Sequence, residues 1–114
     1  MASTRASARL AEVAPVFAAL GDQTRLRLIA RLSSEGPQSI SRLADGAKVT
    51  RQAITKHLRA LEGVGLARSS RAGRERIWEL RAKRLNTAEH YLEQISNQWD
   101  AVINRLRAFV ESEE

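Results

Sequence analysis

A long apolar stripe near the C-terminal end constrains the fold of this chain more than any other feature of its sequence. Between residues 85 and 109, apolar side chains recur at alternating steps of three and four, the a/d pattern of a helix that packs along a seam. A chain of 114 residues builds one modest core. Because such a core cannot cover a stripe of about three heptads, we expect a last helix over about 85–110 that packs against a second subunit.

The segments before this helix predict a mainly α-helical domain with a small β-hairpin. Residues 1–8 are small and polar, so we expect them to be disordered and residues 9–114 to form a single domain. A first helix is predicted over about 9–20. A second helix starts after Asp22, a suitable N-cap, and ends at Gly36, with Leu26, Ile29 and Leu32 on its apolar face.

Two short helices joined by a tight turn follow in the sequence. Ser41 is a candidate N-cap for a brief helix that ends near Ala47, and Thr50 is a candidate N-cap for a helix over about 51–62. The turn between them includes Gly46. Two helices at this spacing predict a helix-turn-helix.

A hairpin is predicted directly after the second of these helices. The strand-like segments are 66–70 and 75–80, and Gly73 lies between them at a position that requires a positive φ. A hairpin beside a helix-turn-helix is called a wing. The predicted fold class is therefore mainly α-helical with a small β-hairpin, a winged helix-turn-helix.

The helix at 51–62 separates its side chains into two faces. Ile54, Leu58 and Leu61 lie on the predicted buried face, and no acidic residue occurs from 46 to 61. Basic and amide side chains without carboxylates suit the major groove, because they neutralise phosphates and read base edges. The candidate DNA contacts on this helix are Thr50, Arg51, Gln52, Thr55, Lys56 and Arg59.

The wing adds further positive charge to a chain with a formal net charge of +6. A basic loop can follow the DNA backbone or enter a minor groove, although charged residues on a hairpin also protect a solvent-exposed strand edge. The candidate DNA contacts on the wing are Arg68, Arg71, Arg74 and Arg76. The implied partner is double-stranded DNA.

Other classes of function find little support in the sequence. The chain has no cysteine, which excludes disulfides and thiolate sites. It contains no catalytic motif, so we expect a protein that is not an enzyme. His90 and Glu93 are three residues apart, but two groups make a poor metal site, and we predict no metal and no cofactor. No apolar run is long enough for a membrane span or a signal peptide, so we predict no membrane association and a cytoplasmic location.

Several segments together resemble the ArsR family of winged-helix repressors. Residues 16–29, VFAALGDQTRLRLI, resemble the opening of that family, and residues 50–61, TRQAITKHLRAL, resemble its recognition helix. Residues 63–67 and 73–80 resemble its strand and wing. The long last helix with its tryptophan is similar to the non-metal autorepressor branch.

The resemblance implies a homodimer, formed by the first and last helices, that binds an inverted-repeat operator. With the apolar stripe, it places the following residues at the subunit interface: Leu10, Val13, Phe17, Leu92, Ile95, Trp99, Val102 and Leu106. The leading hypothesis is a sequence-specific repressor. The alternative is a winged-helix module for protein–protein interaction without sequence-specific DNA binding. The operator, the regulated genes and any effector ligand stay open.

Overall fold

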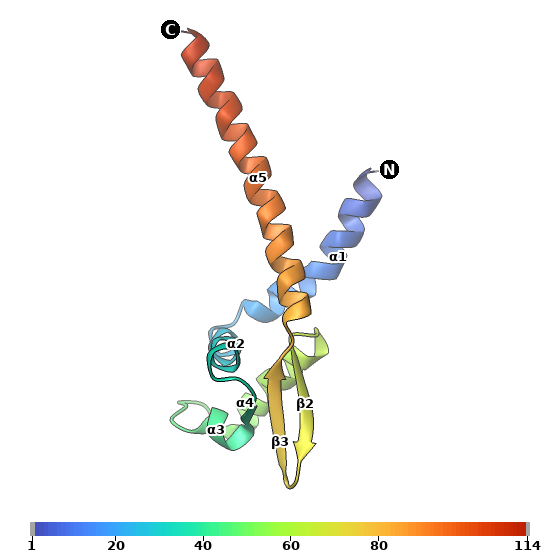
Figure 1. Ribbon diagram of the computed structural model, residues 1–114, viewed down its shortest axis with the longest axis vertical. Coiled ribbons are helices and arrows are strands. Elements are labelled where there is room, and N and C mark those ends of the chain that lie inside the picture. The colour runs from blue at the N-terminus through green and yellow to red at the C-terminus, as the bar shows by residue number, and fades with distance from the viewer. Residues whose placement is uncertain (1, 114) are drawn as a thin grey trace.

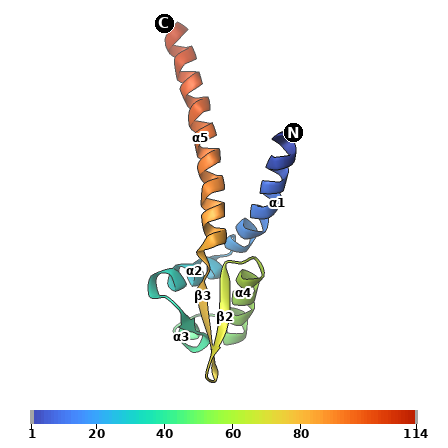
Figure 2. The same cartoon turned by 45° about the vertical axis from the view of Figure 1, so that its right-hand side comes forward.

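The computed structural model describes the backbone of residues 2–113 and the side chains of residues 8–112. A small three-stranded sheet and three helices form a globular unit, from which the first and last helices project (Figures 1 and 2). The elements are α1 (Ala2–Leu20), α2 (Gln23–Glu35), β1 (Gln38–Ser39), α3 (Ile40–Ala44), α4 (Arg51–Gly63), β2 (Ala67–Ala72), β3 (Glu75–Leu80) and α5 (Ala82–Glu113).

The molecule is elongated because α5 extends far beyond the globular unit. Its extents are 69 × 33 × 20 Å and its radius of gyration is 19.4 Å, whereas a compact chain of this length has a radius of gyration of about 13 Å. Helix α5 has 32 residues, which corresponds to a length of about 48 Å. The globular unit therefore covers only the beginning of this helix.

Helix α1 begins earlier than the sequence analysis expected. It starts at Ala2, so residues 2–8 continue the helix and are not a disordered segment, while Met1 lies outside the described residues. The segment contains no glycine or proline before Pro15 and is rich in alanine, the best helix former. Pro15 itself lies inside the helix, where it removes one backbone hydrogen bond.

Helix α2 is bounded by the two predicted residues. The Asp22 carboxylate accepts a hydrogen bond from the Arg25 backbone N–H at 3.0 Å, and Gly36 ends the helix with a φ of 77°. The buried residues are Leu28, Ile29 and Leu32. Leu26, which was predicted on the apolar face with Ile29 and Leu32, is 49% exposed, because around the helix axis it lies beyond Ile29, at the edge of the buried face.

The short helix α3 begins after Ser39, not after Ser41. The Ser39 hydroxyl accepts from the Arg42 backbone N–H at 3.2 Å, and the helix ends at Ala44 instead of Ala47. Ser39 is both the last residue of β1 and the N-cap of α3, so the helix starts as soon as the strand ends. The turn then passes through Gly46, with a φ of 73°, to Thr50.

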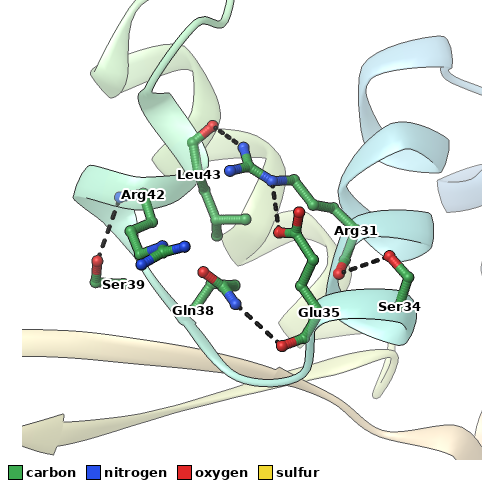
Figure 3. Close-up of polar contacts among 7 residues, drawn as sticks. All are labelled: Arg31, Ser34, Glu35, Gln38, Ser39, Arg42 and Leu43. Atoms are coloured by element: carbon green, nitrogen blue, oxygen red, sulfur yellow. Dashed lines mark hydrogen bonds and ion pairs between the residues drawn. The ribbon is translucent and has the colours of Figure 1, made fainter.

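Arg31 connects α2 to the end of α3 (Figure 3). Its Nε donates to Glu35 Oε2 at 2.9 Å and one terminal nitrogen donates to the Leu43 carbonyl at 3.3 Å. Gln38 donates from Nε2 to the Glu35 carbonyl at 3.1 Å. These contacts position the first helix of the helix-turn-helix against α2.

The sheet contains the predicted hairpin and one further strand. The strand order is β1–β3–β2, and both pairings are antiparallel. Strand β2 continues to Ala72, which pairs with Glu75, so the turn consists of Gly73 and Arg74. Gly73 has the predicted positive φ, 65°. Strand β1 pairs with β3 through Gln38 and Trp78.

The core lies between α4, α2 and the sheet. Leu58, Leu61 and Leu66 are fully buried, and Trp78 is 1% exposed. The predicted buried face of α4 is confirmed, since Ile54, Leu58 and Leu61 all belong to this core.

We predict that Leu58→Ala lowers the free energy of unfolding by about 2–5 kcal/mol, because it leaves a cavity in this core. Leu26→Ala is the matched control, and its expected effect is within about 0.5 kcal/mol. Urea unfolding at a fixed protein concentration measures both. If Leu58→Ala and Leu26→Ala lowered the free energy of unfolding equally, the core would not be centred on α4.

Candidate DNA-binding surface

Helix α4 presents a basic face away from the core. Arg51, Gln52, Lys56 and Arg59 are exposed, and Thr55 is half-buried. Each long side chain on this face is a hydrogen-bond donor, and Gln52 also accepts. The structure thus brings together the predicted contacts of the recognition helix along one surface.

Two threonines of the predicted set also serve the helix itself. Thr50 Oγ1 accepts from the Ala53 backbone N–H at 3.1 Å as the N-cap, and Thr55 Oγ1 donates to the Arg51 carbonyl at 3.0 Å. The cap satisfies an N–H group that would otherwise have no partner in the helix. Thr50 therefore fixes where the basic face begins.

A small polar cluster positions α4 against the two preceding helices. Arg25 Nε donates to the Ala19 carbonyl at 2.6 Å, and its Nη1 lies 3.4 Å from His57 Nδ1. His57 Nδ1 is also 3.8 Å from Asp22 Oδ2. The cluster joins the end of α1, the start of α2 and the middle of α4. The sequence indicates Asp22 only as a helix cap, because its contact with His57 spans 35 residues of sequence.

The pKa of Asp22 is lowered from its ordinary value of 3.8, mainly because the Arg25 backbone N–H donates to the carboxylate. Burial opposes this shift, and the nearby charges of His57 and Arg25 add to it. The folded structure therefore stabilises the ionised form of the Asp22 carboxylate over the protonated form.

The four wing arginines do not share one surface. Arg71 and Arg76 are paired across the hairpin on the same face as Trp78, and Arg76 donates to Ser69 Oγ at 2.8 Å. Arg74 lies in the turn. Arg68 lies on the opposite face and forms an ion pair with Glu79. The structure therefore separates Arg68 from the other three.

Glu62, in the last turn of α4, connects this helix to the wing. Its Oε2 accepts from Ser69 Oγ at 3.1 Å and from the Ser69 backbone N–H at 3.3 Å. Because Arg76 donates to the same hydroxyl, the hairpin and the helix are held together by one continuous set of hydrogen bonds.

The apolar stripe of α5 divides into a covered part and an exposed part. Leu85 and Ala88 pack on the core of the globular unit. Beyond them, Leu92, Ile95 and Trp99 are 52%, 46% and 61% exposed. The other exposed large apolar side chains at the projecting helices are Leu10, Leu106, Phe109 and Val110, and Val102 is half-buried.

The predicted interface set needs one correction. Val13 is 1% exposed, because the side of α1 that carries it faces the same chain, and a second subunit cannot contact it. Phe17 is half-buried and its ring lies 6.2 Å from that of Tyr91. Arg9 donates to Gln94 Oε1 at 2.9 Å, so α1 and α5 already contact each other within the chain.

Metal-ligating clusters and membrane-spanning helices are both absent from the residues that the structure describes. No group of three or more potential metal-ligating side chains is found there, and His90 and Glu93 form only an exposed pair at 3.9 Å. In the same part of the chain, no helix is long and apolar enough to cross a membrane.

A helix-turn-helix with a basic outer face, followed by a hairpin, defines the winged helix-turn-helix class of DNA-binding regulators. Comparison with known proteins agrees. A helix-turn-helix domain model matches residues 20–70. An ArsR-like transcriptional regulator from Rhodococcus sp. RHA1 has a similar structure, with a TM-score of 0.74 and 40% identity; the match covers 87% of this chain and 92% of that one.

A curated relative and a second structure extend the comparison. An uncharacterized HTH-type transcriptional regulator, YuzN of Bacillus subtilis (strain 168), is 38% identical over 68 residues, which are 54% of this chain and 74% of YuzN. The homodimeric winged helix-turn-helix DNA-binding domain of Mb0332 from Mycobacterium bovis shares the fold, with a TM-score of 0.63, 24% identity and coverage of 82% and 85%. The chain belongs to the ArsR family of transcriptional regulators. It is a DNA-binding regulator and not an enzyme.

We predict that the stabilising effect of Asp22 depends on pH. A carboxylate whose pKa is lowered by folding stabilises the protein fully above its unfolded pKa, and this effect disappears as the pH falls through the folded pKa. Asp22→Ala should therefore unfold at lower urea concentration than the wild type near neutral pH, and this difference should shrink below about pH 3.8. Asp100→Ala, on α5, controls for the loss of one negative charge. If the difference in unfolding between the wild type and Asp22→Ala stayed constant down to low pH, the ionised Asp22 carboxylate would not be the source of the stabilisation.

Proposed function

We propose that this protein is a repressor that binds an inverted-repeat operator as a homodimer. The observation that carries the proposal is the outer face of α4, where exposed Gln52, Lys56 and Arg59 lie together and no acidic residue occurs from 46 to 61. A solvated helix face normally mixes both signs of charge, whereas a surface for a polyanion does not. The proposed location is the cytoplasm, where bacterial DNA lies.

In the proposed complex, α4 lies in the major groove and the wing follows the neighbouring backbone. Gln52 and Arg59 carry side chains of the types that read base edges, and Lys56 neutralises a phosphate. At the wing, Arg71, Arg74 and Arg76 contact the backbone or minor groove. Arg68 contributes less, since its guanidinium is already paired with Glu79.

The exposed part of the α5 stripe supports the proposed dimer. Apolar surface of this extent on a single chain marks an interaction site, and a domain of the same fold, Mb0332, is homodimeric. A two-fold dimer places two recognition helices about 34–36 Å apart, one turn of DNA. The proposed interface consists of Leu10, Phe17, Leu92, Ile95, Trp99, Val102 and Leu106. It does not include Val13, which is buried within its own chain.

We place the protein in the non-metal branch of the family. The chain contains no cysteine, and its last helix has a single histidine, His90. Binding to DNA would then respond to a ligand other than a metal ion, or to none.

We predict that Lys56→Ala weakens binding to all DNA sequences and lowers the slope of log affinity against log salt by about 1, because one phosphate contact is lost. Gln52→Ala should instead change the preference at one base pair by roughly 1–3 kcal/mol. Gel-shift titrations of the protein's own promoter fragment, at several salt concentrations, measure both. Arg105→Ala, an exposed cation far along α5, is the matched control.

Unchanged affinity and sequence preference for both α4 variants would contradict the assignment of this face. If the wild-type protein binds no genomic fragment but still dimerises, the alternative function as a protein-interaction module is favoured. Mapping of bound DNA across the genome, together with transcript levels after deletion, then separates repression from activation.

We predict that Ile95→Asp disrupts the dimer, because it places an unpaired charge in a buried seam at a cost of several kcal/mol. Asn97→Asp is the control: it adds the same charge to the same helix at an exposed position off the stripe. Sedimentation gives the mass, circular dichroism the fold and gel-shift the DNA affinity. A folded Ile95→Asp dimer with normal affinity would show that the interface lies elsewhere.

A further inference from the structure

A cavity of about 530 Å³ lies where the DNA-binding unit meets the projecting helices. Its walls come from α1, the end of α4, the start of β2 and the start of α5. Because Ala67 pairs with Leu80 and Ala72 with Glu75, this junction is at the opposite end of the hairpin from its turn (Figure 1). The volume lies within the range of about 300–1,000 Å³ that is usual for small-molecule sites.

The wall of this cavity carries more positive than negative charge. Its basic side chains are Arg68, Arg81, Lys83 and Arg84, and its carboxylates are Glu12 and Glu62. Arg84 is paired with Glu12 at 2.8 Å, and Arg68 with Glu79. Within the part of the chain that the structure describes, Arg81 and Lys83 form no ion pair.

The backbone at the cavity adds to this preference for negative charge. Arg81, Lys83 and Arg84 belong to the junction between β3 and α5, and the first turn of α5 contains no acidic residue. The N-terminus of a long helix carries partial positive charge and N–H groups without helical partners. Here that partial charge adds to the charge of the exposed Arg81 and Lys83 side chains at the edge of the cavity.

We propose that this cavity binds a small organic anion with two or more acidic groups, either carboxylates or phosphates. Arg81 and Lys83 supply the charge-assisted hydrogen bonds, and the guanidinium of Arg84 is shared between Glu12 and the ligand. The site is separate from the DNA-binding face, which lies on α4 and toward the turn of the hairpin.

The position of the cavity gives the anion a regulatory role, and this part rests on the proposed function. The Glu12–Arg84 ion pair joins α1 to α5, the two helices of the proposed dimer interface. Glu62 joins α4 to the wing through Ser69. An anion that shares Arg84 with Glu12 weakens this ion pair between α1 and α5, and the affinity of the dimer for DNA falls.

The test uses the full-length protein and two probes, citrate for carboxylates and pyrophosphate for phosphates. Calorimetric titration without DNA, at constant ionic strength, should show saturable binding of at least one probe at one site per chain. Arg81→Gln and Lys83→Gln should each weaken that binding about tenfold, or about 1.4 kcal/mol. Arg105→Gln removes the same charge outside the cavity and should leave it unchanged.

Absence of saturable binding for both probes would overturn the proposed site. The site would also be overturned if Arg105→Gln weakened probe binding as much as Arg81→Gln and Lys83→Gln do, since the binding would then depend only on the net charge of the protein. For regulation, a gel-shift with the promoter fragment should show lower affinity at a saturating concentration of the probe than in chloride of equal ionic strength; unchanged affinity overturns the regulatory role. Since calorimetry needs no DNA, failure of the site is distinguished from failure of the proposed function.

Discussion

The packing of α4 on the sheet is the contact on which the rest of the structure depends. Leu58 and Leu61 are fully buried, and Trp78 closes the core from β3. Once these side chains point inward, the helical period of 3.6 residues turns Lys56 and Arg59 outward. The basic surface is thus a geometric consequence of the hydrophobic core, and no separate interaction is needed to orient it.

Polar contacts then fix α4 relative to its neighbours, at its middle and at its C-terminal end. Arg25 and Asp22 meet His57 on the side of α2, and Glu62 meets Ser69 on the side of the wing. Such contacts are individually weak where they are partly exposed. Their effect is to set an orientation, since the apolar core alone tolerates small rotations of a helix.

The division of α5 into a packed start and an exposed remainder links the fold to the proposed function. Leu85 and Ala88 anchor the helix in the globular unit, while Trp99 is 61% exposed far from it. A chain of this size lacks the surface to cover both parts of the helix. The same junction holds the cationic cavity, so the proposed dimer contacts and the proposed ligand site share α1 and α5.

The sequence by itself determined the element order, the two faces of α4 and the turn at Gly73, because these follow from local periodicity, capping and backbone preference. It did not predict the exposure of Leu26, the burial of Val13 or the pairing of Arg68 with Glu79. Each of these depends on which segment lies opposite, and distant segments are brought together only by the tertiary fold. For the same reason the cavity at Arg81 and Lys83 was missed: its walls come from three separate stretches of the chain, at Glu12, at residues 62–68 and at residues 81–87.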